Sequence, residues 1–192
     1  MHKLFKCLIF MLIFTISMLQ GEIEEIIIKW NPFICLDTCI PRLASSLQEI
    51  PEIANLKIDS KVGVAIMTWD PMRPYSYEPI RRALANAGAT LLDMRMRIKG
   101  TVYHEGESFY LDANGNNTRF LLVGPLRVDP YNYVPRYSLA AHELTLDMKS
   151  RLLTIEKSGE LILIAGPLYL PAQYPQILII EDIKKLDKEE RG

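Results

Sequence analysis

The sequence lacks a charge excess, a phosphate-binding loop and a recognisable catalytic set. Its formal net charge is −1, whereas a general nucleic-acid-binding protein carries a basic excess or stripe. Gly106 and Gly115 do not form a glycine-rich loop that cradles phosphates. His104 and His142 are far apart and have no partner at ligand spacing. We therefore predict no nucleic-acid partner and no enzymatic activity.

The chain also has no apolar run long enough to span a bilayer comfortably, although one shorter run stands at its beginning. Residues 1–6 are basic, residues 7–19 are almost entirely apolar, and residues 20–22 turn polar. This order is typical of a secretory signal peptide. We expect residues 1–21 to be removed and the mature protein to be exported, either periplasmic or extracellular. The alternative is an uncleaved N-terminal anchor, which would be the chain's contact with the membrane.

The remaining sequence has the composition of a folded protein. The apolar fraction is 49% and the charged fraction 23%, which predicts a packed core in one ordinary domain or two small ones. Strands and helices alternate in its first half, in the order strand, helix, strand, strand, helix, strand. The predicted segments are 24–30, 38–47, 56–59, 62–69, 77–87 and 92–99. This order predicts a ferredoxin-like βαββαβ domain over residues 22–98.

After Ile98 the pattern becomes all-β, with short strands separated by glycine-containing turns. One of these predicted strands is Leu152–Ile155. The pattern resembles a small OB-like β-barrel over residues 99–183, followed by a charged tail over 184–192. The predicted fold class is therefore α+β, with a ferredoxin-like domain followed by an OB-like barrel. Because residues 92–103 show no linker composition, we expect one strand to run from the first part into the second.

Two cysteines four residues apart, Cys35 and Cys39, lie where the first strand meets the first helix. A helix N-terminus lowers a cysteine pKa and favours the thiolate that a metal needs. Two thiolates suit Cu(I), while Zn(II) needs two further ligands. In an oxidising compartment the same pair would form a disulfide. The residues leave both interpretations open.

The cysteine loop, the closely spaced middle strands and a second helix that ends in glycine, residues 80–88, resemble the heavy-metal-associated domain over residues 24–94. In that family two cysteines in a C-x-x-C spacing bind a soft metal, whereas here three residues separate them. The resemblance implies a ferredoxin-like fold and a Cu(I) or Zn(II) site at Cys35 and Cys39.

Two functions follow from these features. The first is an exported protein that binds or delivers a soft metal ion through Cys35 and Cys39. The second is a cell-envelope interaction module in which Cys35 and Cys39 form a structural disulfide and loops of the barrel meet a partner protein. In the last strand of the first part an apolar set alternates with a charged set, which predicts one buried and one polar face: Leu92, Met94, Met96 and Ile98 against Asp93, Arg95, Arg97 and Lys99. The basic face, formed by Arg95, Arg97 and Lys99, suits either an acidic partner or a solvated sheet surface.

Overall fold

A computed structural model describes residues 22–31, 39–113, 115, 117–126 and 138–186. Its elements, in chain order, are β1 Glu22–Trp30, α2 Cys39–Gln48, β2 Ile53–Asp59, β3 Val64–Trp69, α3 Glu78–Ala87, β4 Leu91–Glu105, β5 Ser108–Ala113, β6 Thr118–Val123, η1 Leu139–His142, α4 Leu146–Ser158, β7 Ile162–Tyr169, β8 Gln176–Ile179 and β9 Asp182–Lys185. No helix within these residues is long and apolar enough to cross a membrane.

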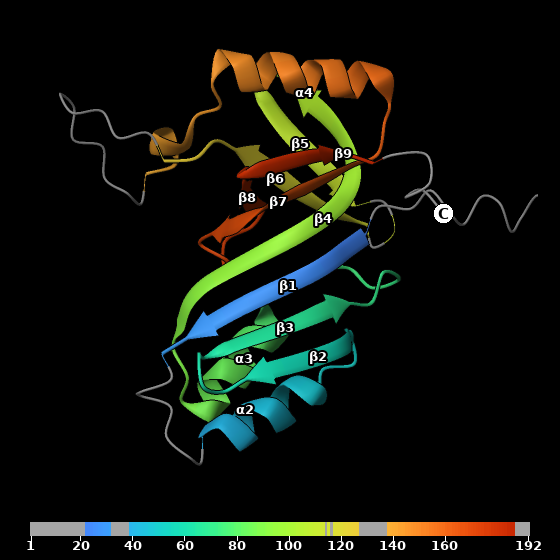
Figure 1. The fold of residues 1–192 in the computed structure, drawn as a ribbon. Helices are drawn as coiled ribbons and strands as arrows, with labels where there is room; N and C mark the ends of the chain where they lie inside the picture. The colour runs from blue at the N-terminus through green and yellow to red at the C-terminus, as the bar shows by residue number, and fades with distance from the viewer. Residues whose placement is uncertain (1–21, 32–38, 114, 116, 127–137, 187–192) are drawn as a thin grey trace, which may run out of the picture.

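The nine described strands form one sheet in the order β2-β3-β1-β4-β5-β6-β8-β7-β9. In its first half, β1 lies between β3 and β4 and is antiparallel to both. Alternate residues of β1, including Ile26 and Ile28, are fully buried on one face. Helices α2 and α3 lie on that face and contribute Leu43, Leu47 and Ile80 to the same core (Figure 1).

The second half of the sheet closes on itself. Strand β4 pairs with β5 at its carboxyl end and with β7 over residues 95–100, so that β4, β5, β6, β8 and β7 form a closed five-stranded barrel. The β6–β8 pair is parallel and the other pairs of the ring are antiparallel. Strands approach closely at Gly100, where a Cβ atom would meet the Asp112 carbonyl oxygen at 2.5 Å. A Cβ at Gly166 would collide with the Ile179 carbonyl oxygen. Glycine at these places lets the barrel close.

The predicted fold class, a ferredoxin-like βαββαβ domain followed by an OB-like barrel, is wrong. The protein is a mixed α+β fold in which strands make up 45% of the described residues, with three α-helices and a closed five-stranded barrel. The reason is the 15-residue strand β4, which belongs both to the helix-covered sheet and to the barrel. The predicted boundary at residue 98 falls in the middle of this strand, and Figure 1 shows β4 curving through both halves.

A further error concerns Leu152–Ile155, which was predicted as a strand and lies within helix α4. The Thr145 side chain accepts a hydrogen bond from the Met148 N–H and so caps the start of this helix. Gly159 ends it in the left-handed conformation, with φ +62°. Leu152 and Ile155 are both buried, and their spacing of three places them on one helix face.

Tyr75, in the connection before α3, links the two halves. Its ring lies 5.2 Å from that of Trp69 and 6.1 Å from that of Phe120 in the barrel. Its N–H donates to the Thr118 hydroxyl oxygen at 2.8 Å, and its own hydroxyl donates to the Met94 sulfur at 3.7 Å. Burial raises the pKa of Tyr75 well above that of an ordinary phenol. The core is thus continuous from the helices into the barrel.

Candidate functional site

Cys39 is the first residue of α2 and is only 9% exposed. Its sulfur forms a disulfide. Cys39 is the one cysteine within the described residues, so its partner lies outside them, as does Cys35. A sulfur in a disulfide is not a thiolate and does not serve as a metal ligand in that form. Within the described parts of the chain there is no group of three or more His, Cys, Asp or Glu side chains arranged to hold a metal ion.

Methionine thioethers are soft ligands that could add to a Cu(I) site, so the places of the described methionines bear on the predicted metal site. Met94 and Met96 are 2% and 1% exposed in the core, as their alternating positions on the strand predicted. Met72 is 73% exposed on a loop.

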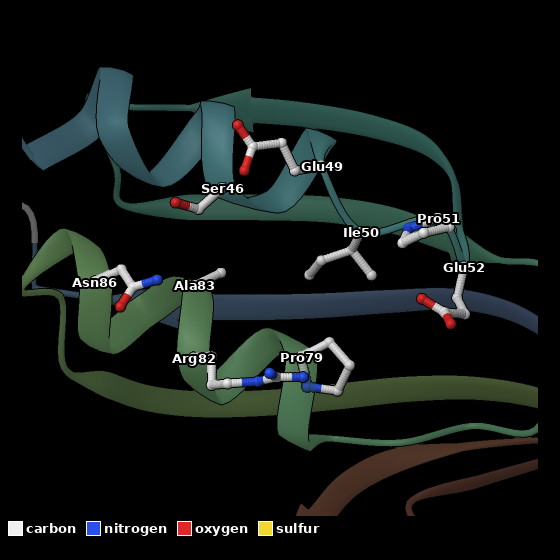
Figure 2. A pocket seen from close by; sticks show the side chains of 9 residues that line it. All are labelled: Ser46, Glu49, Ile50, Pro51, Glu52, Pro79, Arg82, Ala83 and Asn86. Atoms are coloured by element: carbon white, nitrogen blue, oxygen red, sulfur yellow. The ribbon is translucent and has the colours of Figure 1, made fainter.

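An open groove of about 380 Å³ lies between α2 and α3. Figure 2 shows Ser46 of α2 and Glu49 just after it on one side, Arg82 and Asn86 of α3 on the other, and Ile50 projecting between the helices. The Arg82 guanidinium lies 3.8 Å from the Glu78 carboxylate on its own helix, and its side chain is 66% exposed. The groove is shallow and its polar groups are solvated, as expected where two amphipathic helices meet.

A second recess, here called the barrel pocket, lies where β5 and β6 meet η1 and the start of α4, and also has a volume of about 380 Å³. Its apolar walls are Phe109, Leu121, Leu122, Val123, Leu139 and Leu144. Its polar lining is Glu107, Ser108, His142, Glu143 and Lys149. Small-molecule sites in proteins commonly combine apolar walls with a few placed polar groups in this way.

His142 is the buried polar group of the barrel pocket, with an exposed fraction of 6%. Two hydrogen bonds hold it against Gly124. The Gly124 N–H donates to the His142 carbonyl oxygen at 2.8 Å, and His142 Nδ1 lies 3.0 Å from the Gly124 carbonyl oxygen. The His142 ring also meets the Tyr169 ring edge to face, with 5.2 Å between centroids. A Cβ at Gly124 would lie 2.6 Å from the Glu143 carbonyl oxygen, so the close approach needs glycine.

The bond to Gly124 determines the tautomer of His142. A carbonyl oxygen only accepts hydrogen bonds, so Nδ1 must carry the proton and donate it. In the neutral ring Nε2 is then an acceptor. The fully buried side-chain N and O atoms that lack a partner in the described residues are Trp30 Nε1, Tyr103 OH and Gln176 Oε1. Nε2 of His142 is not among these atoms.

His104 forms a different kind of contact. Its ring Nδ1 lies 2.6 Å from one Glu156 carboxylate oxygen, and the backbone N–H of His104 donates to the other carboxylate oxygen at 3.0 Å. The pair joins the end of β4 to α4. Its role is therefore explained by packing of the helix on the barrel.

The predicted basic strand face is present, and its two arginines are ion-paired. Met94, Met96 and Ile98 face the core, and Arg95 and Arg97 lie on the opposite face, as the alternation predicted. Arg95 is ion-paired with Glu181, and Arg97 lies 3.8 Å from Glu24. Lys99 is 9% exposed. The positive charges of Arg95 and Arg97 are thus paired on the protein itself, which weakens the case for an acidic partner at this face.

Sequence reasoning did not find the barrel pocket. Its defining pair, Gly124 and His142, is 18 residues apart and comes from a strand end and a 3₁₀ turn. Neither residue stands in a motif. The comparisons add no further guide: no family model, no curated protein and no solved structure matches this chain.

Proposed function

We propose that this protein is an exported interaction module that holds a partner protein at the barrel pocket. The observation that carries the proposal is His142, a buried side chain held against Gly124 that lines a recess of both apolar and polar residues. Recesses that combine apolar walls with a few fixed polar groups are common binding sites in proteins. The protein would be an adaptor of the cell envelope without catalytic activity.

In this proposal the disulfide of Cys39 is structural and joins it to Cys35. Its support is the oxidised state of Cys39 at the start of α2, a helix whose Leu43 and Leu47 are fully buried. A short covalent loop at that point would fix where the helix begins. Oxidation of this kind is what an exported protein encounters.

Site-specific photo-crosslinking in the native compartment tests the function. A crosslinking residue at position 139, on the pocket wall and 41% exposed in the native protein, should trap one defined partner. The matched control is position 146, which is 83% exposed and does not line the pocket. Equal crosslinking from both positions, or none from position 139, would contradict the proposal. The same material tests export, because mature protein that keeps residues 1–19 would indicate an anchor.

Soft-metal binding is the second candidate function, and it applies to the reduced protein. It is favoured by the place of Cys39 at a helix N-terminus, where unpaired N–H groups stabilise a thiolate. We expect reduced protein to bind one Cu(I) more tightly than Zn(II), since two thiolates complete a linear Cu(I) site but leave Zn(II) without two ligands. A Cu(I) competition titration decides this. If wild type and Cys39→Ser compete equally poorly for the metal, the candidate is lost.

A further inference from the structure

We infer that two copies of this protein pair through the free edge of β2 and form a symmetric dimer. The two strands run antiparallel, with Ile58 of both copies on the two-fold axis and Lys57 of each copy opposite Asp59 of the other. This contact goes beyond the proposed function and uses none of the residues that line the barrel pocket. Three features of β2 point to it: its open backbone, its apolar side and its charges.

Strand β2 stands at one end of the nine-stranded sheet and pairs with β3 on one side (Figure 1). In the described part of the chain no strand lies on its other side. β9 stands at the opposite end, but it is only four residues long, and the carbonyl oxygen of its Ile183 accepts a hydrogen bond from Arg151 of α4. An edge strand with open N–H and C=O groups is a template for pairing with another chain. The seven residues of β2 are therefore the larger open edge.

The direction of the backbone groups of β2 follows from hydrogen bonds one strand further in. The Trp30 N–H of β1 donates to the Gly63 carbonyl oxygen, so Gly63 and every second residue after it in β3 bond to β1. The residues between them bond to β2, where their partners are the odd-numbered residues of 55–59. The even-numbered residues, Leu56 and Ile58, consequently point their N–H and C=O groups to the free edge.

The side of β2 that packs on the core is apolar and incompletely covered. Ile53, Leu56 and Ile58 pack against the core but remain partly exposed, as does Ile40 of α2. Met67, the neighbour of Leu56 on β3, is only 1% exposed. The cover thus ends at β2, and a second copy laid against the edge removes this apolar strip from water, which favours association.

The charges of β2 select one register for the pair. Lys57 and Asp59 are exposed on the other side of the strand, and a lysine at a sheet edge normally deters pairing. The two-fold axis must pass through a residue, because the outward groups of both strands have to meet. An axis at Lys57 or at Asp59 sets two like charges opposite each other, which is unfavourable. An axis at Ile58 instead sets Lys57 opposite Asp59 on both sides of the axis.

The axis at Ile58 also agrees with the geometry of the strand. An axis at Leu56 would draw the β-bulge at the start of β2 into the pair and set Lys57 against an asparagine. The axis at Ile58 avoids the bulge and joins the outward backbone groups of the two Ile58 residues. Asp59 is well placed for it, because its Oδ1 accepts a hydrogen bond from the Lys61 N–H at 3.0 Å, which holds the carboxylate at the end of the strand. The edge is thus complementary to a second copy of itself.

Sedimentation velocity of full-length mature protein over a concentration series tests the dimer. One strand pair is a small interface, so we expect a reversible dimer in the micromolar range. Lys57→Glu and Asp59→Lys each place like charges opposite each other, so each variant should dimerise about tenfold more weakly. Mixed in equal amounts, the two variants have complementary charges again and should form a heterodimer with wild-type affinity. A wild type that stays monomeric throughout the series, or a mixture that associates no more tightly than the single variants, overturns the inference.

Cysteine pairing checks the register and does not depend on the folding of the Asp59 variant. In Ile58→Cys the two new thiols face each other across the axis, with about 5.5 Å between Cα atoms, which allows a disulfide. In Leu56→Cys, the matched control, the thiols lie about 13 Å apart, because their offset is four strand residues. We expect oxidation to link Ile58→Cys into a covalent dimer and to leave Leu56→Cys unlinked. Linking of Leu56→Cys at an equal or higher rate, or of neither variant, overturns the inference.

Discussion

The substitution Leu178→Ala tests whether the helix-covered half and the barrel unfold together. Leu178 lies in β8, is 0% exposed, and belongs to the same buried cluster as Trp30 and Trp69. These are the only two tryptophans in the chain. Trp30 lies in β1 and Trp69 in β3, and neither strand belongs to the barrel. Tryptophan fluorescence therefore reports on the half that Leu178 does not belong to.

Replacing a fully buried leucine by alanine costs about 2–5 kcal/mol, because apolar burial is lost and a cavity remains. For a loss of about 3 kcal/mol, a chain of this size should melt roughly 6–12 °C lower. If β4 couples the halves, the fluorescence transition moves by this full amount. Hydrogen exchange of the β5 amides should give the same loss of stability, since β5 unfolds in the same step.

The matched control is Leu146→Ala, because Leu146 is 83% exposed and the same chemical change should alter stability by less than about 0.5 kcal/mol. The coupling argument would be refuted if Leu178→Ala removed protection from β5 while the fluorescence midpoint stayed at the wild-type value. Fast exchange from residue 96 to residue 101 in the wild type would refute it independently, since that stretch of β4 would then be a flexible linker.

Three further predictions concern Tyr75 in the core, two glycines and the disulfide of Cys39. Because burial raises the pKa of Tyr75 in the folded protein, its phenol ionises at a lower pH in the unfolded chain. The free energy of unfolding should therefore fall above about pH 10, by up to about 1.4 kcal/mol per pH unit. Tyr75→Phe should flatten this dependence in denaturant titrations at several pH values. Gly166→Ala should prevent barrel closure, so circular dichroism should show little folded protein. Gly88→Ala is the control, because Gly88 has φ +74° but open space around it. It should lower the free energy of unfolding by only about 1 kcal/mol in a denaturant titration. Reducing a Cys35–Cys39 disulfide should lower stability by about 2 kcal/mol, measured by denaturation with and without reductant; an unchanged midpoint would deny it a structural role.

Local patterns in the sequence predicted local structure correctly. The alternation of Met94, Met96 and Ile98 with charged residues predicted which face of β4 is buried, because successive side chains of a strand point to opposite sides. The prediction was wrong at Leu92, the first residue of the pattern, which is 64% exposed. Gly88 predicted the end of α3, because glycine takes the left-handed conformation without strain.

The sequence-based prediction was wrong where a short apolar run is compatible with either a strand or a helix. Four residues such as Leu152–Ile155 suit a buried strand or a buried helix equally well, and periodicity does not distinguish them. The distinguishing signals lay outside the run, in the cap at Thr145 and the glycine at 159. Read together, they mark the two ends of a 13-residue helix.

The architecture depends on pairings that no local pattern contains. Arg95 of β4 is aligned with Pro167 of β7, and Phe120 of β6 with Gln176 of β8. Each pair joins residues more than 50 positions apart, and together they close the barrel. The barrel pocket is a product of this closure, because its walls come from strands and turns that meet only when the ring is complete. A sequence pattern therefore drew attention to the cysteines and missed His142.

The two candidate functions are located at different ends of the molecule, and this separation can be tested. Figure 1 shows α2, which begins at Cys39, at the end opposite to α4 and η1, which border the barrel pocket. Sites that are far apart and share no partners usually contribute independently. Reducing the disulfide of Cys39 should therefore lower the melting temperature but leave the yield of the crosslink from position 139 within twofold of that of the oxidised protein, at a temperature where both forms are folded. Crosslinking under reducing and oxidising conditions measures this. A large change in yield would mean that the continuous core transmits the state of α2 to the barrel, and the two ends would then act as one switch.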